Sequence, residues 1–443
     1  QLFKVMLRLT HNILFRLYSS INRRTFFCFL LLCYSIIDVQ QLFLSCIDIV
    51  APLTLKFLIA VKTKIDSCDK MKFSVKTIGP SKLRSGTLTG FKRLPEMVLE
   101  TPLLLLYTKG GSVPHITHEV LQLITTDNQA VQQTLPSTVL NHDAVREFKK
   151  GLPKFVGLQE CMTYLSIQDP AHKTPEGFNR KKEVSVWTHA GRVSLDADRY
   201  MDVVEAFQPD MFEALSNGDT NADTTKKKIG KVVDSTRDLY EDCLQRHSRS
   251  SILKDSSFLA VLEGGYDLEA RKKVGLSYSD APVDGFVING LHNNGADVEK
   301  IDFQQIRALI EATIEPLPEN KLRVLHGGWT PRNVLKLVEM GIDVFDASYP
   351  YLATERMCAL TFNFEAVEWD TEVKDDAESL DEISLKDANY REDFTPFLVG
   401  CRCLACTKHT KAYVHHLINN KELLSYTLLQ IVVSIVYHEK SVR

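Results

Sequence analysis

The sequence predicts an α/β fold, a TIM (β/α)8 barrel followed by a C-terminal helical zinc-binding subdomain. Short apolar runs alternate six times with amphipathic helical patterns, which is typical of a parallel sheet with crossover helices. The length of 443 residues suits one large domain with appendages, because an α/β barrel takes about 250 residues before insertions. Near the end of the chain, three cysteines precede a helical pattern. An open doubly wound sheet is the alternative arrangement of these elements.

The composition is that of an ordinary globular protein, with 44% hydrophobic and 25% charged residues. A net charge of -3 excludes a protein that binds nucleic acid through its overall charge, so an RNA role would need a local patch or a basic partner. We interpret Lys181-Lys182 and Lys226-Lys227-Lys228 as solvated helix ends rather than as such a patch. The ten cysteines fit a reducing compartment with one metal site, hence a cytoplasmic protein.

Residues 1–70 differ from the rest of the chain in their pattern of apolar and polar residues. Residues 25–50 and 53–61 are apolar, but acidic and amide side chains interrupt them, so no run of about 20 apolar residues is available to span a bilayer. No short apolar segment with a small-residue cleavage site indicates a signal peptide. We expect translated non-coding sequence or a faulty gene model, with the true start at Met71. A membrane anchor is the alternative.

Residues 71–364 hold the elements of the predicted barrel. The predicted strands are residues 103–107, 184–187, 211–215, 258–262, 285–288, 324–325 and 344–345. The predicted helices are residues 196–207, 225–246, 303–314 and 331–340. Thr330 and Pro331 are a good helix start, with Thr330 as the N-cap and proline at the first helical position.

Turn residues follow four of the predicted strands, where barrel enzymes place their chemistry. These turns are Glu263-Gly264-Gly265, Asn289-Gly290-Leu291, His326-Gly327-Gly328 and Asp346-Ala347-Ser348. A glycine pair taken alone is usually just a tight turn. Glycines at successive strand ends, however, let the backbone approach a planar ligand closely and indicate a pocket.

The last part of the chain divides into an acidic insertion, residues 365–393, and a subdomain, residues 394–443. The insertion is rich in acids and lacks periodicity, so we expect it to be solvated and partly disordered. In the subdomain, Cys401, Cys403 and Cys406 can converge on one soft cation, and thiolates at tetrahedral geometry favour Zn²⁺. A fourth ligand is then required, and a helix-like run follows over residues 410–431.

These residues resemble the tRNA-guanine transglycosylase family over about residues 71–431. The resemblance rests on residues 341–346 with Pro350, on Glu263-Gly264-Gly265, and on the three cysteines followed by residues 412–417. Residues 106–109, 184–192, 208–210, 354–356 and 358–362 resemble the non-catalytic accessory subunits of its eukaryotic members.

The resemblance implies a zinc-bearing TIM barrel that exchanges guanine for queuine at wobble position 34 of tRNAs with GUN anticodons. In catalytic members an aspartate attacks the ribose C1′ to form a covalent intermediate, and a second aspartate is the general acid/base. The target base leaves its stack to reach the pocket. Asp346 matches the nucleophile position.

Three departures from the family count against catalysis by this chain. The Asp-Ser-Gly-Gly-Phe-Gln run that carries the acid/base is absent, and the corresponding residues 128–135 read NQAVQQTL. Glu263 replaces the glutamine that reads the base, and residues 215–217 lack the base-binding aspartate. The arginines that grip tRNA correspond to Leu352 and Glu355. We therefore interpret Asp346 as a relic or a structural carboxylate, and Glu263, Gly264, Gly265 and Gly290 as remnants of a substrate pocket.

The fourth zinc ligand also departs from the family, whose ligating histidine corresponds to Val432. The candidates to replace it are His438, His416 and His409. Because residues 432–443 no longer resemble the family, we expect a truncated or wrongly spliced C-terminus. Without a good fourth ligand, zinc affinity should fall and the C-terminal helix should fray.

With these departures, the resemblance implies a non-catalytic subunit that forms a heterodimer with a catalytic queuine tRNA-ribosyltransferase subunit and contacts tRNA through that complex. The interface is expected near the zinc subdomain, on a helical and more apolar surface. One alternative is an active homodimeric transglycosylase that uses Asp346, and another is a zinc-dependent RNA-binding protein. The resemblance also permits peripheral membrane association, at the mitochondrial outer membrane.

Overall fold

The fold is described from a computed structural model that covers residues 71–79, 82–125, 127–361 and 382–441. The predicted extension over residues 1–70, the last three residues of the predicted barrel range, 362–364, and the first part of the predicted acidic insertion, residues 365–381, lie outside the described residues. Residues 382–393 of that insertion form β15 (Glu382–Ser384) and the 3-10 helix η3 (Ala388–Tyr390).

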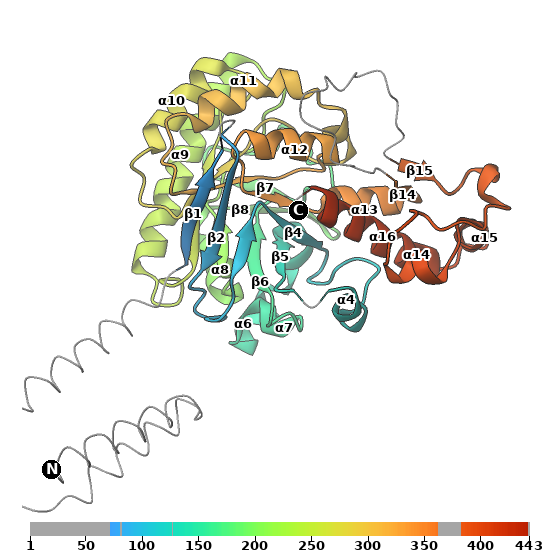
Figure 1. Cartoon of the computed structure of the whole chain (residues 1–443). Coiled ribbons are helices and arrows are strands. Elements are labelled where there is room, and N and C mark those ends of the chain that lie inside the picture. The colour runs from blue at the N-terminus through green and yellow to red at the C-terminus, as the bar shows by residue number, and fades with distance from the viewer. Residues whose placement is uncertain (1–70, 80–81, 126, 362–381, 442–443) are drawn as a thin grey trace, which may run out of the picture. The chain divides into compact units, whose positions relative to one another are not determined.

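Eight parallel strands close into a barrel, so the predicted (β/α)8 architecture is confirmed (Figure 1). Each strand pairs with the next barrel strand along the chain, and Val344 to Asp346 of the last strand pair with Leu103 to Leu105 of the first. The barrel strands are β4 (Leu103–Thr108), β5 (Ala130–Thr134), β6 (Met162–Ser166), β9 (Met211–Glu213), β10 (Ser257–Leu262), β11 (Gly285–Ile288), β12 (Leu322–Leu325) and β13 (Val344–Asp346).

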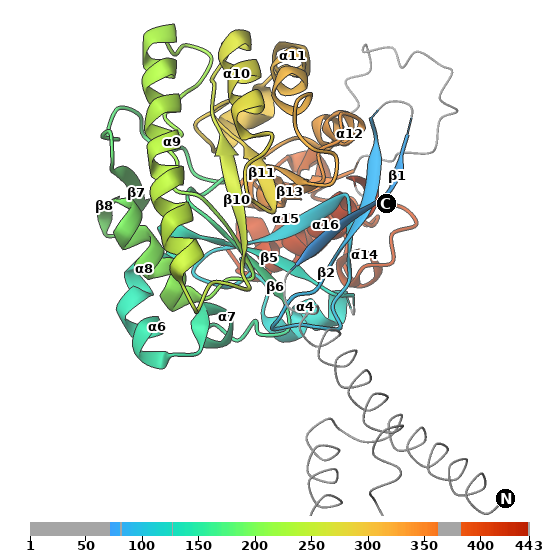
Figure 2. The ribbon, with the colours of Figure 1, turned by 90° about the vertical axis from the view of Figure 1, so that its left-hand side faces the viewer.

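Helices surround the barrel, and Figure 2 shows α9, α10 and α11 side by side on its outer surface. Thr330 caps α12 as predicted, since its hydroxyl accepts a hydrogen bond from the Asn333 N–H and Pro331 begins the helix. The helices are α4 (His118–Ile124), α5 (Leu135–Thr138), α6 (His142–Phe148), α7 (Gly151–Phe155), α8 (Ala197–Phe207), α9 (Lys226–Arg249), α10 (Leu268–Tyr278), α11 (Phe303–Ile314), α12 (Pro331–Glu339), α13 (Ser348–Glu355), α14 (Leu404–Lys408), α15 (Lys411–Asn419) and α16 (Leu424–Ser441).

A small antiparallel sheet closes the end of the barrel at which the strands begin. It consists of β1 (Lys72–Ile78), β2 (Arg84–Thr89) and β3 (Leu99–Thr101). Leu88 and Leu99 pack in one apolar cluster with interior strand residues such as Val261. Arg84 forms a buried ion pair with Asp343, the residue before β13. A functional site is therefore expected at the opposite end of the barrel, where the strands end.

Two short antiparallel pairs lie outside the barrel. β7 (Val184–Thr188) and β8 (Gly191–Leu195) form a hairpin, so the predicted strand 184–187 exists but does not belong to the barrel. β14 (Cys358–Leu360) pairs with β15. Two barrel strands, β5 and β6, were not predicted from the sequence. Both contain polar residues at buried positions, among them Gln132 and Thr163.

The C-terminal subdomain contains α14, α15 and α16, and Figure 1 shows it beside α13. The predicted single helical run over residues 410–431 is wrong, because α15 ends at Asn419 and α16 begins at Leu424. Lys421, between them, has a left-handed backbone with φ of 58°, which interrupts helical geometry. Among the described residues, no helix combines the length and apolar character needed to cross a membrane.

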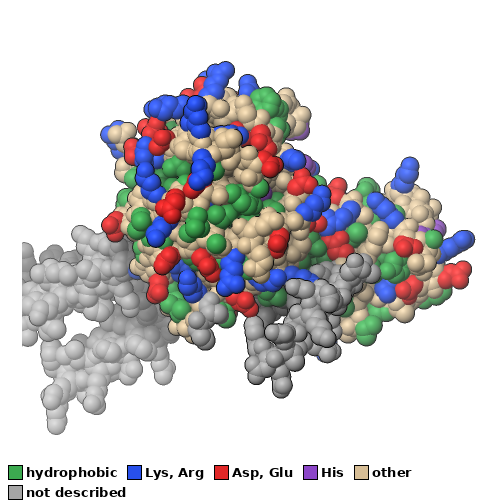
Figure 3. Space-filling model, turned by 90° about the horizontal axis from the view of Figure 1, so that it is seen from above, with side chains coloured by type: hydrophobic (Ala, Val, Ile, Leu, Met, Phe, Trp, Pro, Cys, Tyr) green, Lys and Arg blue, Asp and Glu red, His purple; other side chains and the backbone are tan. Residues whose placement is uncertain are grey.

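Charged side chains of both signs share one face of the described part of the chain. On the face seen in Figure 3, lysine and arginine side chains are interspersed with aspartate and glutamate. This mixture agrees with the small net charge of -3. Any contact with RNA would therefore depend on a local group of cations.

Candidate functional site

Asp346 lies at the end of β13, in the mouth of the barrel, and is almost completely buried. Its Oδ1 accepts a hydrogen bond of 2.9 Å from the Ser348 N–H, and its Oδ2 accepts one of 2.7 Å from the Gly327 N–H. The Nδ1 of His326 lies 3.5 Å from the same Oδ2. Both oxygens of the carboxylate therefore already have hydrogen-bond donors from within the chain.

His326 lies between Asp346 and a second buried carboxylate, Glu213. Its Nε2 lies 2.9 Å from the Tyr164 hydroxyl and 3.6 Å from Oε2 of Glu213. Burial disfavours the charged imidazolium, but the nearby carboxylates of Asp346 and Glu213 outweigh this and raise the pKa of His326 to about 9. His326 is therefore a cation at neutral pH and neutralises part of the charge of the two carboxylates.

Glu213 is held as firmly as Asp346. Its Oε1 accepts a hydrogen bond of 2.6 Å from the Ile167 N–H, and its Oε2 accepts one of 2.7 Å from the Tyr164 hydroxyl. We call Asp346, His326, Tyr164 and Glu213 the mouth network. Each member contacts a member from another part of the barrel, so the network links β13, the residue that follows β12, β6 and β9.

The turn after β10 is organised by a buried arginine. The guanidinium of Arg271 donates to the carbonyl oxygens of Leu262, Gly265 and Asn289. A Cβ on Gly264 would lie 2.9 Å from the Arg271 side chain. The group that lies close to the backbone at Gly264 is therefore the Arg271 side chain of the same chain.

Glu263 fills the space next to Gly290. Its Oε1 accepts a hydrogen bond of 3.0 Å from the Asn289 side chain, and a Cβ on Gly290 would lie 2.2 Å from its Oε2. Burial raises the pKa of Glu263 to about 8, against the lowering effect of Arg271. The group is thus predominantly a neutral carboxylic acid at pH 7, which suits an oxygen without a hydrogen-bond partner.

A strap, residues 170–179, crosses the barrel mouth. The Gly295 N–H donates to the Pro170 carbonyl at 2.9 Å, and the Thr174 N–H donates to the Asn293 carbonyl at 2.8 Å. The Gly177 N–H donates to Asp219 at 2.9 Å. The cavity left beneath the strap has a volume of about 40 Å³, whereas sites for small organic ligands span about 300–1,000 Å³.

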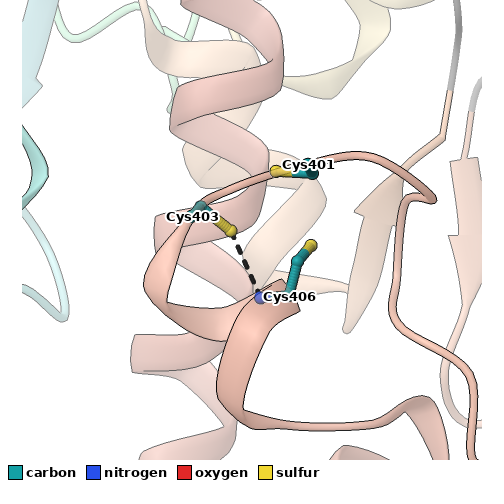
Figure 4. A group of neighbouring side chains, drawn as sticks. All are labelled: Cys401, Cys403 and Cys406. Carbon is teal, nitrogen blue, oxygen red and sulfur yellow. Dashed lines mark hydrogen bonds between the residues drawn. The ribbon is translucent and has the colours of Figure 1, made fainter.

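The cysteine cluster is the second candidate site, and Figure 4 shows its three side chains converging. The sulfurs of Cys401, Cys403 and Cys406 lie within 4.8 Å of one another. The Cys406 N–H donates to the Cys403 sulfur at 3.3 Å because Cys403 is the N-cap of α14. Three converging thiols are the donor set and arrangement that a tetrahedral zinc ion requires at three of its four positions.

Comparison with known proteins identifies the family. The family model described as queuine tRNA-ribosyltransferase matches residues 81–439. The chain belongs to this family. It is 40% identical to queuine tRNA-ribosyltransferase accessory subunit 2 of Ixodes scapularis, over 82% of this chain and 93% of that protein. The accessory subunits 2 of Aedes aegypti and Gallus gallus are each 36% identical, over 81% and 80% of this chain and 85% and 89% of their own lengths.

Among the described residues, no fourth histidine, cysteine or carboxylate joins the cysteine cluster. Val432, at the position of the family histidine, is fully buried in α16. His416 is exposed and hydrogen-bonded to Asn420, and the ring of His409 stacks on Tyr413 with 5.2 Å between centroids. The side chain of His438 lies outside the described part of the chain.

Sequence reasoning singled out Asp346 and Glu263 but missed the partners that define their state. His326 was noted only as part of a turn, and Tyr164 and Glu213 were not singled out as site residues. The sequence signal that could have identified Tyr164 and Glu213 is a polar side chain within or at the end of an otherwise apolar, buried strand. Such a residue requires a partner, although the sequence does not say which.

Proposed function

We propose that this chain is the non-catalytic subunit of a heterodimeric tRNA-guanine transglycosylase. The complex exchanges guanine for queuine at wobble position 34 of tRNAs with GUN anticodons. The accessory subunits 2 to which the chain is similar support this role. In this proposal the complex is cytoplasmic, and any contact with the mitochondrial outer membrane is peripheral.

The state of Asp346 is the observation that carries the proposal. A nucleophilic carboxylate needs an oxygen that can reach C1′, but Asp346 is almost completely buried, both of its oxygens accept backbone hydrogen bonds and one also faces His326. Glu213, the nearby acid, is bound by Tyr164 and by the Ile167 N–H. A missing general acid/base alone costs roughly 10²- to 10⁴-fold in rate. These contacts support a structural role for Asp346.

Zn²⁺ fits the cysteine cluster and would be held by the thiolates of Cys401, Cys403 and Cys406. In this proposal the ion stabilises the subdomain of residues 394–443, which follows the barrel of residues 71–364 and the insertion of residues 365–393. His438 or a ligand from outside the chain would supply the fourth position. Bound zinc contributes mainly folding free energy, because a structural site is not preformed in the unfolded chain.

The surface near the cysteine cluster supports a contact with the catalytic subunit. Within residues 394–424, six large hydrophobic side chains are exposed, an unusual concentration for a surface without a partner. They are Phe394, Val399, Leu404, Tyr413, Leu423 and Leu424. Val399 is 87% exposed and Leu423 is 80% exposed, so both could bury most of their area in an interface.

Trapping the covalent intermediate tests the proposal directly. The complex is incubated with substrate tRNA, denatured and separated by size, and each subunit is examined for attached RNA. We expect the adduct on the catalytic subunit alone, and guanine exchange by the mixture but not by this chain. RNA attached to this chain, lost in Asp346→Asn, would instead contradict the proposal and support the alternative prediction of a transglycosylase that uses Asp346.

A further inference from the structure

An aromatic and cationic cluster lies on the β7–β8 hairpin, in a sequence run that the proposed function does not explain. Trp187 of β7 packs edge to face on Phe178, with ring centroids 5.0 Å apart. The guanidinium of Arg192 lies over the Phe178 ring, 5.7 Å from its centroid. Trp187 and Arg192 are paired residues on neighbouring strands, so the register of the hairpin holds the cluster together. We call Phe178, Trp187 and Arg192 the hairpin platform.

The hairpin platform borders the barrel mouth. Phe178 belongs to the strap, and the next residue, Asn179, lines the cavity and donates to the Asn217 side chain at 2.9 Å. The Phe178 carbonyl accepts a hydrogen bond from the Ser185 hydroxyl, so the backbone of the platform is fixed to β7. Despite these contacts, 45% of Phe178 remains exposed. Figure 2 shows β7 and β8 beside α8 and α9 at the outer edge of the barrel.

The segment that carries the hairpin platform is rich in cations. Residues 178–192 contain four cations and one acid, a local net charge of +3 in a chain whose net charge is -3. Lys181 and Lys182 lie in the turn before β7, so the interpretation of this pair as a helix end is wrong. The two lysines pair with Asp238 and Asp242 at 3.4 and 3.3 Å, but their side chains are 76% and 65% exposed. Exposed pairs of this kind are weak. The lysines can therefore exchange these partners for phosphates.

We propose that the hairpin platform stacks an unpaired base of an RNA, whose neighbouring phosphates contact the surrounding cations. Unstacked bases are recognised on aromatic rings and guanidinium planes, and cations that follow the backbone supply the affinity. The inference deepens the proposed function and rests on it, because the RNA is then the tRNA held by the complex.

Binding of fluorescein-labelled substrate tRNA to the heterodimer, followed by anisotropy, tests the inference. We expect Phe178→Leu to weaken binding roughly 10-fold, within the range for loss of one stacked base. Phe178→Tyr, which keeps the ring, should retain the wild-type Kd. Phe148→Leu is the matched control, since Phe148 is 37% exposed and carries Lys150 over its ring at 5.7 Å, but lies on α6. The control should bind like the wild type.

The salt dependence separates the stacked base from the phosphate contacts. Phe178→Leu should lower affinity equally at every salt concentration. The double variant Lys181→Gln/Lys182→Gln should instead reduce the slope of log K against log salt by about 0.7 for each lost phosphate contact in a single strand.

Each outcome is decisive. If the wild-type complex exchanges guanine and Phe178→Leu binds tRNA like Phe148→Leu, the platform inference fails while the proposed function stands. If Phe178→Leu weakens association of the subunits instead of tRNA binding, the platform is a protein contact and the inference also fails. If the wild-type complex does not exchange guanine, the proposed function fails. Anisotropy with the same variants of this chain and tRNA alone then still tests whether the platform binds RNA.

Discussion

The barrel mouth and the cysteine cluster differ in whether the chain itself supplies the partners. At the mouth, His326 lies between Asp346 and Glu213, and backbone N–H groups bind both carboxylates. At the cluster, three sulfurs converge, and no fourth ligand from the described residues joins them. A buried group with internal partners needs no ligand, whereas three converging thiols are a donor set that could hold a metal ion. In the proposed subunit, therefore, the mouth network is structural, and the subdomain would depend on a bound ion and on the partner.

The largest expected effect comes from removing one thiol of the cluster. Cys403→Ala should abolish zinc binding and expose residues 394–441 to protease, because structural zinc contributes about 10 kcal/mol or more to folding of its domain. Metal content per chain and limited proteolysis measure this. Cys358→Ala is the control, since Cys358 is comparably buried but lies outside the cluster. Full zinc content in Cys403→Ala would show that the cysteine cluster does not hold the ion.

The next effect comes from breaking the mouth network. His326→Leu leaves Asp346 and Glu213 without their shared cation, and losing one partner of a buried ion pair costs about 3–5 kcal/mol. The midpoint of urea unfolding should fall accordingly. His292→Leu is the control, because burial lowers the pKa of His292 to about 4 and this histidine is neutral at pH 7. Equal losses in the two variants would contradict a charged His326.

A smaller effect is expected at the apolar surface of the subdomain. Leu423→Glu should weaken association with the catalytic subunit by about 2 kcal/mol, roughly 30-fold in Kd, because a charge replaces a buried contact. Isothermal titration calorimetry measures the Kd, and thermal unfolding of the variant alone should be unchanged. Leu276→Glu, at a residue of α10 that is 57% exposed, should leave the Kd as it is. An unaltered Kd in Leu423→Glu would show that the interface with the catalytic subunit lies elsewhere.

Measured per pH unit, the smallest effect is a pH dependence of stability that arises at the mouth. The pKa of Glu263 is raised from 4.5 to about 8, so between these values the folded state holds a proton that the unfolded state releases. Stability therefore falls as pH rises through this window, by at most about 1.4 kcal/mol per pH unit. Glu263→Gln should flatten the slope of urea midpoints between pH 5 and 8. A slope unchanged by the substitution would show that Glu263 ionises normally.

His326 adds a second component to the pH dependence. Its pKa is raised from 6.5 to about 9, so its stabilising effect is complete below pH 6.5 and is lost as pH rises towards 9. In Glu263→Gln the remaining fall in stability should lie in this higher range.

Most of the barrel was predictable because β4 and β9 to β13 are short apolar runs that end in turn residues. β5 and β6 were not, since Gln132, Gln133 and Thr163 occupy positions where an exposed strand or a loop is the simpler interpretation. In the closed barrel all three side chains are buried. Likewise, the strand 184–187 was correctly predicted as a strand, but local pattern does not reveal whether a strand joins the barrel or a hairpin.

By itself, the sequence determined the fold class, the position of Asp346 at a strand end and the spacing of the three cysteines, because each depends on residues close together in the chain. Only the tertiary structure decided that His326 faces both Asp346 and Glu213, and that Glu263 occupies the space beside Gly290. Parallel strands bring their ends together from distant parts of the sequence. Protonation then depends on burial and neighbouring charge, which exist only after the barrel has closed.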